Sequence, residues 1–309
     1  LGAIAGNLGV PGGGVSYYFQ RRGGFDPSFV PRPENAGART FLEPLLGEEI
    51  LRADPKIRVG VIDNGNPVSQ LPDSKTVARA LESIDFLAVL DPFLTDTAEL
   101  ADVVLPTTTM LEEHDVVGAY GHHHVQLVAP VTKPPEGVLC DFEIYQALAR
   151  RLGFGDRLAG TPESYVDRFL GPMAARGLTR EALAKGGLRK PDAPRVLFEG
   201  KRFPTPSGRF QLIGEFPDAP VPLDDGYPLH LMSISTAKNQ SSQISRAEQL
   251  AAPPIVTLHP DAAPGKRDGD EAILASPIAS VRVRLQFDPR PRRDVVVYPK
   301  GRWGALGGP

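Results

Sequence analysis

The spacing of apolar residues changes several times between positions 56 and 106, from alternate residues to helical spacing and back. Three apolar, β-branched runs predict strands over 57–62, 86–90 and 102–106. Between the first two runs, the spacing typical of a helix appears at Val77, Ala80, Leu81 and Ile84. Thr95 or Asp96 is placed to cap a short helix before the third strand. This alternation predicts a parallel, Rossmann-like α/β domain, which we expect over 56–155.

Polar residues follow the first two predicted strands directly. Asn64 and Asn66 come after the first strand, and Asp91 comes after the second. Parallel sheets bind ligands at the carboxyl ends of their strands, which favours a binding site at these residues. The same residue types are also ordinary turn formers, so the spacing by itself leaves both interpretations open.

The last part of the chain, residues 226–309, has a different pattern. Short alternating runs are separated by Pro, Gly and Asp, and they predict strands over 229–234, 255–258, 271–275, 281–287 and 294–298. Several short strands with regular turn signals are typical of a β-barrel or a sandwich.

The other segments are rich in turns. Residues 1–55 form a Gly- and Pro-rich lead-in, and 156–225 form a mixed helical and turn-rich connector. Helices are predicted over 1–5, 42–52, 142–152, 162–170 and 179–184. The third of these has Asp141 as its N-cap and Gly153 as its C-cap. The runs 195–198 and 203–212 predict a turn that leads into a strand.

Composition and charge exclude several classes of protein. With 309 residues, of which 41% are hydrophobic and 23% charged, the chain is ordinary globular material. Its net charge of -3 gives no electrostatic case for nucleic acid, and no apolar run approaches the ~18 residues of a membrane span. A single cysteine, Cys140, excludes an internal disulfide and an iron–sulfur cluster held within this chain. The helical pattern that begins at Leu1 without a cap leads us to expect a fragment or a processed product.

Two stretches suggest ligand chemistry of their own. The glycines of residues 1–20 allow an anion nest of backbone N–H groups, but no nucleotide-binding fingerprint is met and a tight loop fits equally. In a strand, His122 and His124 share one side while His123 points to the other. Two histidines without an acidic or cysteine partner make a weak zinc site. We therefore assign no metal ligand and no catalytic residue in this chain.

Several motifs, taken in order, carry a resemblance to a known family. They are GNLGVPGGG at 6–14, NP at 66–67, DPFLTDTA at 91–98, ADVVLP at 101–106, Glu112, TPSGR at 205–209, and HPDAA with RDGD at 259–263 and 267–270. This series resembles the molybdopterin oxidoreductase family, which contains formate dehydrogenases, nitrate reductases and dimethyl sulfoxide reductases. The tract YGHHHVQ at 120–126 is similar to cytoplasmic, formate-dehydrogenase-like members.

The resemblance implies a cofactor and the residues that bind it. Family members bind two molybdopterin guanine dinucleotides around one molybdenum or tungsten, and residues 226–309 would form their double-psi β-barrel, incomplete at its C-terminus. The implied cofactor-binding residues are Asn64, Asn66, Asp91, Asp141, Ser235, Thr236, Lys238, Asn239, Ser242 and Gln243. The histidines would stack on or donate to a pterin.

The resemblance also implies a function and partners. The family's [4Fe–4S] motif and its metal-ligating residue precede the region matched here, so we expect the N-terminal remainder of the enzyme, or an equivalent subunit, to supply them. The whole would be a cytoplasmic enzyme that carries out two-electron redox chemistry on a small substrate, with an electron-transfer partner. A stand-alone or split-subunit module that binds the dinucleotide without activity is the alternative. A nicotinamide-dependent dehydrogenase fits the α/β pattern but lacks the Gly-rich turn after a strand.

Overall fold

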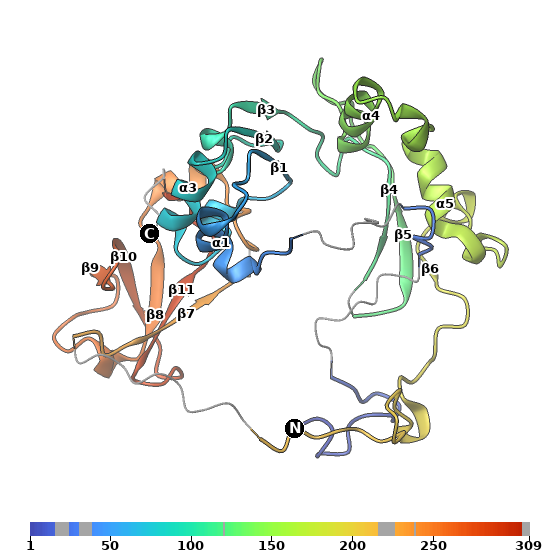
Figure 1. Cartoon of the computed structure of the whole chain (residues 1–309). Helices are drawn as coiled ribbons and strands as arrows, with labels where there is room; N and C mark the ends of the chain where they lie inside the picture. Colours follow the sequence, from blue (N-terminus) through green and yellow to red (C-terminus); the bar gives the residue numbers. More distant parts are fainter. Residues whose placement is uncertain (16–24, 31–38, 120, 216–225, 238, 305–309) are drawn as a thin grey trace. The chain divides into compact units, whose positions relative to one another are not determined.

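The computed structural model describes residues 1–15, 25–30, 39–119, 121–215, 226–237 and 239–304 (Figure 1). The chain divides into two compact units, and each is assembled from two stretches of sequence. Unit 1 combines residues 1–37 with 107–218, and unit 2 combines 38–106 with 219–309. The expected domains, which follow one another along the chain, remain a prediction. Among the helices of the described residues, none combines the length and apolar composition that a membrane crossing needs.

A three-stranded parallel sheet with the order β1-β2-β3 forms the α/β part of unit 2. Its strands are β1 (Val59–Asp63), β2 (Phe86–Leu90) and β3 (Val103–Leu105). Its helices are α1 (Leu46–Arg52), α2 (Pro67–Gln70) and α3 (Ser74–Glu82), with the 3-10 helices η1 (Glu43–Leu45) and η2 (Ala98–Leu100). The parallel α/β alternation expected from the sequence is confirmed.

Helices α1 and α3 pack against the apolar face of this sheet. The buried core of this part consists of Ile50, Val77, Ala80, Leu81, Ile84, Leu87, Val89 and Ala98. Gly47 in α1 allows a close approach to α3, because a Cβ atom there would lie 2.9 Å from the backbone of Thr76 and Val77. Asp73 caps α3 and accepts a hydrogen bond from the backbone N–H of Thr76 at 3.2 Å.

The second part of unit 2 is a mixed five-stranded sheet with the order β7-β11-β8-β10-β9. Its strands are β7 (His230–Ile234), β8 (Ile255–Leu258), β9 (Glu271–Ala275), β10 (Ser280–Phe287) and β11 (Val295–Pro299). Strands β7 and β11 are parallel, as are β8 and β10, while β11 with β8 and β10 with β9 are antiparallel. Helix α7 (Arg246–Ala251) and the 3-10 helix η5 (Pro260–Ala262) complete it. The sequence therefore predicted all five strands, each to within one residue at either end.

Unit 1 contains a three-stranded antiparallel sheet with the order β4-β5-β6. Its strands are β4 (Asp115–Gly118), β5 (His124–Val128) and β6 (Leu188–Arg189). Its helices are α4 (Asp141–Arg151), α5 (Pro162–Ala174) and α6 (Arg180–Leu183), with the 3-10 helices η3 (Gly155–Leu158) and η4 (Glu199–Lys201). The core joins α5 to the sheet through Val116, Val125, Val166, Leu170, Met173, Leu178 and Leu183.

Two expectations for unit 1 are wrong, and a third is displaced by one residue. Residues 2–6 form turns rather than a helix, since a segment this short has no tertiary packing to offset the cost of helix nucleation. Residues 195–198 and 203–212 form no strand, because Phe198 adopts a left-handed backbone (φ 56°) and prolines lack the N–H that a ladder needs. Helix α4 begins one residue earlier than expected, with Cys140 as its N-cap. The side chain of Glu143 reaches back to the N–H of Cys140 at 3.0 Å and fixes that start.

Candidate functional site

Asn64 turns the chain away from the sheet immediately after β1. Its backbone adopts the left-handed region (φ 49°), which Asn tolerates better than most residues. Its N–H donates to the carbonyl oxygen of Leu90 at 2.9 Å, and its side-chain Nδ2 donates to Asp63 at 3.0 Å. The turns after β1 and β2 are therefore joined at the carboxyl edge of the sheet.

Asn66 is the most enclosed of the predicted cofactor-binding residues, with only 2% of its surface exposed. Its Oδ1 accepts two hydrogen bonds from Thr97, from the backbone N–H at 3.3 Å and from Oγ1 at 2.8 Å. Its Nδ2 has no hydrogen-bond partner among the described residues. A buried donor left without a partner costs about 1–3 kcal/mol, so this amide has an unused capacity to bind a ligand.

Asp91 lies at the end of β2 and is 8% exposed. Its Oδ1 accepts a hydrogen bond from the N–H of Phe93 at 2.8 Å, and its own N–H donates to Leu105 at 3.3 Å. The carboxylate is thus held at the same edge as Asn66. A carboxylate in this position can accept further hydrogen bonds, as each of its two oxygens carries two lone pairs.

Buried polar residues that were not predicted to bind lie next to these. Thr95, Asp96 and Thr97 are all buried. The sequence placed Thr95 or Asp96 as a helix cap, but the N-cap of η2 is Thr97. Thr95 Oγ1 accepts a hydrogen bond from the N–H of Ala98 at 3.2 Å. Asp96 does something else: its Oδ2 accepts from Ser69 Oγ and from the N–H of Gly304, both at 2.7 Å. The sequence feature that could have indicated them is the run of three neighbouring polar residues, Thr95, Asp96 and Thr97, just before η2.

The polar loop 235–243, which follows β7, is only partly joined to this edge. Ser242 is buried, and its Oγ accepts a hydrogen bond from Gln70 Nε2 at 3.0 Å. Thr236 Oγ1 accepts from the N–H of Asn239 at 3.0 Å, and Asn239 Nδ2 donates to Glu248 at 3.1 Å. These bonds hold Thr236, Asn239 and Ser242 in place. Two other predicted residues, Ser235 and Gln243, are exposed, and Lys238 lies outside the described residues.

Asp141 lies in unit 1, so its relation to the edge of the parallel sheet remains a prediction. It accepts a hydrogen bond from the hydroxyl of Thr107, a residue that is 3% exposed. Nearby, Thr108 Oγ1 donates to Glu113 at 2.8 Å. Burial raises the pKa of the Glu113 carboxyl, and the charges of Asp141 and other acids raise it further. Glu113 and Asp141 line a hollow of about 200 Å³ together with His114 and Phe142.

Cys140 borders the same hollow and should be chemically inert at neutral pH. Burial raises the pKa of its thiol to about 11, so at pH 8 only about one thiol in a thousand is ionised. We expect slow modification by a disulfide reagent at pH 8 and a rate that climbs until the pH approaches 11. Mass spectrometry of the peptide that contains Cys140 measures this rate. In urea the same peptide should react near pH 8.5, the ordinary thiol range; an identical profile for folded and unfolded protein would contradict the prediction.

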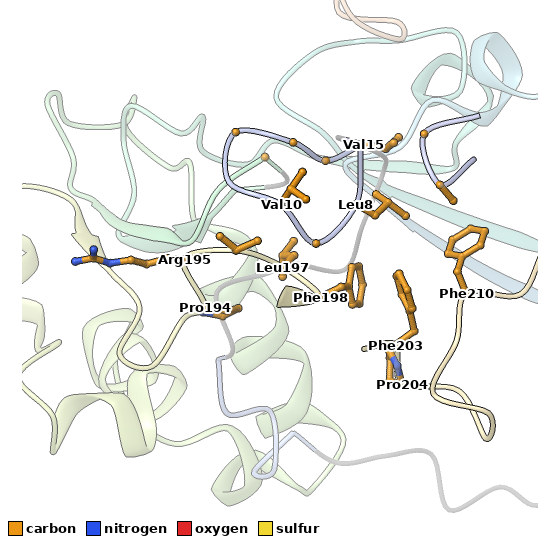
Figure 2. Close-up of a pocket in the computed structure, with 18 of the residues that line it drawn as sticks. Leu8, Val10, Val15, Pro194, Arg195, Leu197, Phe198, Phe203, Pro204 and Phe210 are labelled. Atoms are coloured by element: carbon orange, nitrogen blue, oxygen red, sulfur yellow. The ribbon is translucent and has the colours of Figure 1, made fainter. Parts of the chain in front are cut away.

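Unit 1 also contains a larger hollow of about 890 Å³, shown in Figure 2. Its wall is mainly apolar, and the rings of Phe198, Phe203 and Phe210 follow one another with centroids 5.0 and 5.5 Å apart. Residues 121–124 form another part of the wall. The ring centroids of His122 and His124 are 5.2 Å apart, so these two side chains lie on the same side of the chain, as expected. No three His, Cys, Asp or Glu side chains in the described part of the chain form a group able to hold a metal.

Comparisons with known proteins find relatives of this chain. The model of the family "Molybdopterin oxidoreductase" matches residues 47–151, which include the parallel sheet and α4. The "Probable oxidoreductase YyaE" of Bacillus subtilis is 30% identical over all of this chain and 50% of its own length. The alpha subunit of the F420-dependent formate dehydrogenase of Methanocaldococcus jannaschii is 28% identical over 84% of this chain and 42% of its own length.

A solved structure supports the fold. Acetylene hydratase from Pelobacter acetylenicus matches 87% of this chain and 40% of its own with a TM-score of 0.68, at 20% sequence identity. The chain spans about half the length, or less, of these relatives.

Proposed function

Because the chain belongs to the molybdopterin oxidoreductase family, we propose that it binds the guanine dinucleotide form of that cofactor within a formate-dehydrogenase-like enzyme. The observation that carries the proposal is the buried Nδ2 of Asn66, which has no partner among the described residues. It lies at the carboxyl edge of a parallel sheet, where such folds bind nucleotides. A pterin dinucleotide offers phosphate and ring acceptors that this amide can bind.

The carboxylate of Asp91 provides the complementary chemistry. The N1–H and the 2-amino group of guanine point in the same direction, so one carboxylate can accept from both as a bidentate pair. Asn66 as donor and Asp91 as acceptor therefore suit a ligand that contains both phosphate and guanine. Asn64 and the residues of loop 235–243 would complete this site, and Asp141, in unit 1, stays a predicted cofactor-binding residue.

The bound metal, molybdenum or tungsten, would supply the two-electron chemistry with the small substrate, and the protein would position the cofactor and tune it by hydrogen bonds. The [4Fe–4S] cluster needs several thiolates and this chain has one, so we place the cluster in another part of the enzyme. That part would also supply the metal ligand and contact an electron-transfer partner. We further propose that β7–β11 belong to a double-psi barrel and that the enzyme works in the cytoplasm.

A second candidate is a subunit or stand-alone module that holds the dinucleotide without catalysing a reaction. Two observations favour it: the chain has a single cysteine, Cys140, and it has a set of buried polar groups at the edge of the parallel sheet. The two candidates predict different polypeptides. A mass near 33.2 kDa for the protein in its source cell would favour the module, and a larger mass would favour the enzyme.

The test uses the protein purified from its source cells. We expect molybdenum or tungsten by elemental mass spectrometry, guanosine monophosphate after acid hydrolysis, and formate oxidation with a viologen acceptor. Metal and guanine nucleotide without oxidation of formate would retain the cofactor assignment and redirect the search for the substrate. A preparation that holds neither metal nor guanine nucleotide would refute the proposal.

A further inference from the structure

Asp96 joins two segments that are far apart in the sequence of unit 2. Its side chain is 8% exposed, and its Oδ2 accepts hydrogen bonds from Ser69 Oγ and from the N–H of Gly304, both at 2.7 Å. Ser69 lies in α2, and Gly304 follows β11. Hydrogen bonds to a carboxylate are roughly twice as strong as those between neutral groups, so Asp96 holds α2 and residue 304 firmly together.

A second set of hydrogen bonds connects these two segments to Ser242 in the polar loop. Trp303 precedes Gly304; its Nε1 donates to the carbonyl oxygen of Ser242 at 3.0 Å and its N–H donates to Gln249 at 2.7 Å. Gln70, the neighbour of Ser69, donates from Nε2 to Ser242 Oγ at 3.0 Å. Helix α2, residues 303–304 and Ser242 of the polar loop are therefore connected by hydrogen bonds.

The same hydrogen-bonded residues reach Asn66 from both directions along the chain. Asn66 is the residue before α2, and its side-chain Oδ1 accepts two hydrogen bonds from Thr97, the neighbour of Asp96. A displacement of Asp96 would therefore act on the Asn66 side chain and on the loop together.

We propose that Asp96 is a positioning residue that sets the distance between Asn66 and loop 235–243, so that both can bind one dinucleotide. The inference rests on the proposed function, because it takes these two segments as parts of one cofactor site. Asp96 itself needs no contact with the cofactor. Its contribution is preorganisation: segments already held at the right separation lose less freedom when the ligand binds.

The test compares Asp96→Ala with Asp96→Asn in the full-length protein loaded with cofactor. Asp96→Ala removes the acceptor for both partners, and we expect the dinucleotide to dissociate at least ~10-fold faster, the usual scale for residues that support ligand-binding groups. Asp96→Asn keeps one oxygen that can accept from Ser69 and Gly304, so it should retain most of the affinity. Dissociation is followed by the fluorescence of the released, oxidised pterin. Glu99→Ala, an exposed acid three residues further along, is the matched control.

Hydrogen exchange separates positioning from general stability. Asp96→Ala should raise exchange in 67–70, 239–243 and 302–304 more than in β9 and β10. If Asp96→Ala does not fold, Ser69→Ala removes one of the two bonds and should show the same pattern in weaker form.

Two negative results have different meanings. If the folded Asp96→Ala or Ser69→Ala protein keeps the dinucleotide as long as Glu99→Ala does, Asp96 is only structural and the inference is overturned while the proposed function stands. If the wild-type protein holds no guanine dinucleotide, the proposed function fails and this inference fails with it.

Discussion

Replacing Asn66 by aspartate should weaken binding of the molybdopterin dinucleotide by about 10- to 100-fold, the effect of losing one hydrogen bond to an anionic group. Aspartate keeps an oxygen that can accept from Thr97, so the local turn retains its two bonds. It replaces the amide donor by a carboxylate oxygen, which cannot donate and repels phosphate. The change therefore removes the one unused donor of Asn66 with little change in shape.

The measurement is the amount of cofactor that stays with the full-length protein after dilution, together with its dissociation rate. Gln286→Glu is the matched control, because it makes the same amide-to-carboxylate change at an exposed position of β10 in the same unit. We expect this control to behave as wild type. Equal retention of cofactor by Asn66→Asp and Gln286→Glu would show that the Asn66 amide does not bind it.

Replacing Gly301 by alanine should cost about 2–5 kcal/mol of folding free energy, the sum of left-handed backbone strain and overpacking. Gly301 has φ 89°, a conformation that side chains with a Cβ rarely adopt. A Cβ atom there would lie 1.6 Å from the carbonyl oxygen of Ser241 and 2.8 Å from the Cα of Ser242. Either the backbone at Gly301 or the backbone at Ser241 and Ser242 must therefore move, which displaces Ser242 from its present position. Because native proteins have only about 5–15 kcal/mol of stability, this change threatens the fold of unit 2.

Gly265→Ala is the control for Gly301→Ala. Gly265 has a similar backbone (φ 79°), but a Cβ atom there would meet nothing within 4 Å. It should therefore cost only the conformational strain, about 1–2 kcal/mol. Thermal or urea unfolding of both variants gives the difference, which isolates the close approach of Gly301 to Ser241. Equal losses of stability would mean that this approach does not exist in solution.

Most helices and strands could be predicted from the amino-acid sequence, because the patterns that specify them are local. Apolar periodicity predicted β2, the helix α3 and all five strands of the second sheet. The same periodicity placed Asn66 and Asp91 at the carboxyl ends of parallel strands. Periodicity gave wrong predictions where backbone conformation or a capping bond sets the structure. Phe198 adopts a left-handed conformation that is incompatible with a strand. The bond from the N–H of Cys140 to Glu143 makes Cys140, rather than Asp141, the N-cap of α4.

How these elements combine could not be predicted from local patterns. No periodicity predicts that residues 38–106 share a unit with 219–309, since such contacts depend on side chains that are far apart along the chain. The bonds of Asp96 to Ser69 and Gly304 are of this kind, and so is the bond of Ser242 to Gln70. The same is true of Asn66. Thr97 donates to its Oδ1, and its Nδ2 has no hydrogen-bond partner among the described residues. Whether a polar group is hydrogen-bonded depends on its neighbours in space, which the sequence does not reveal.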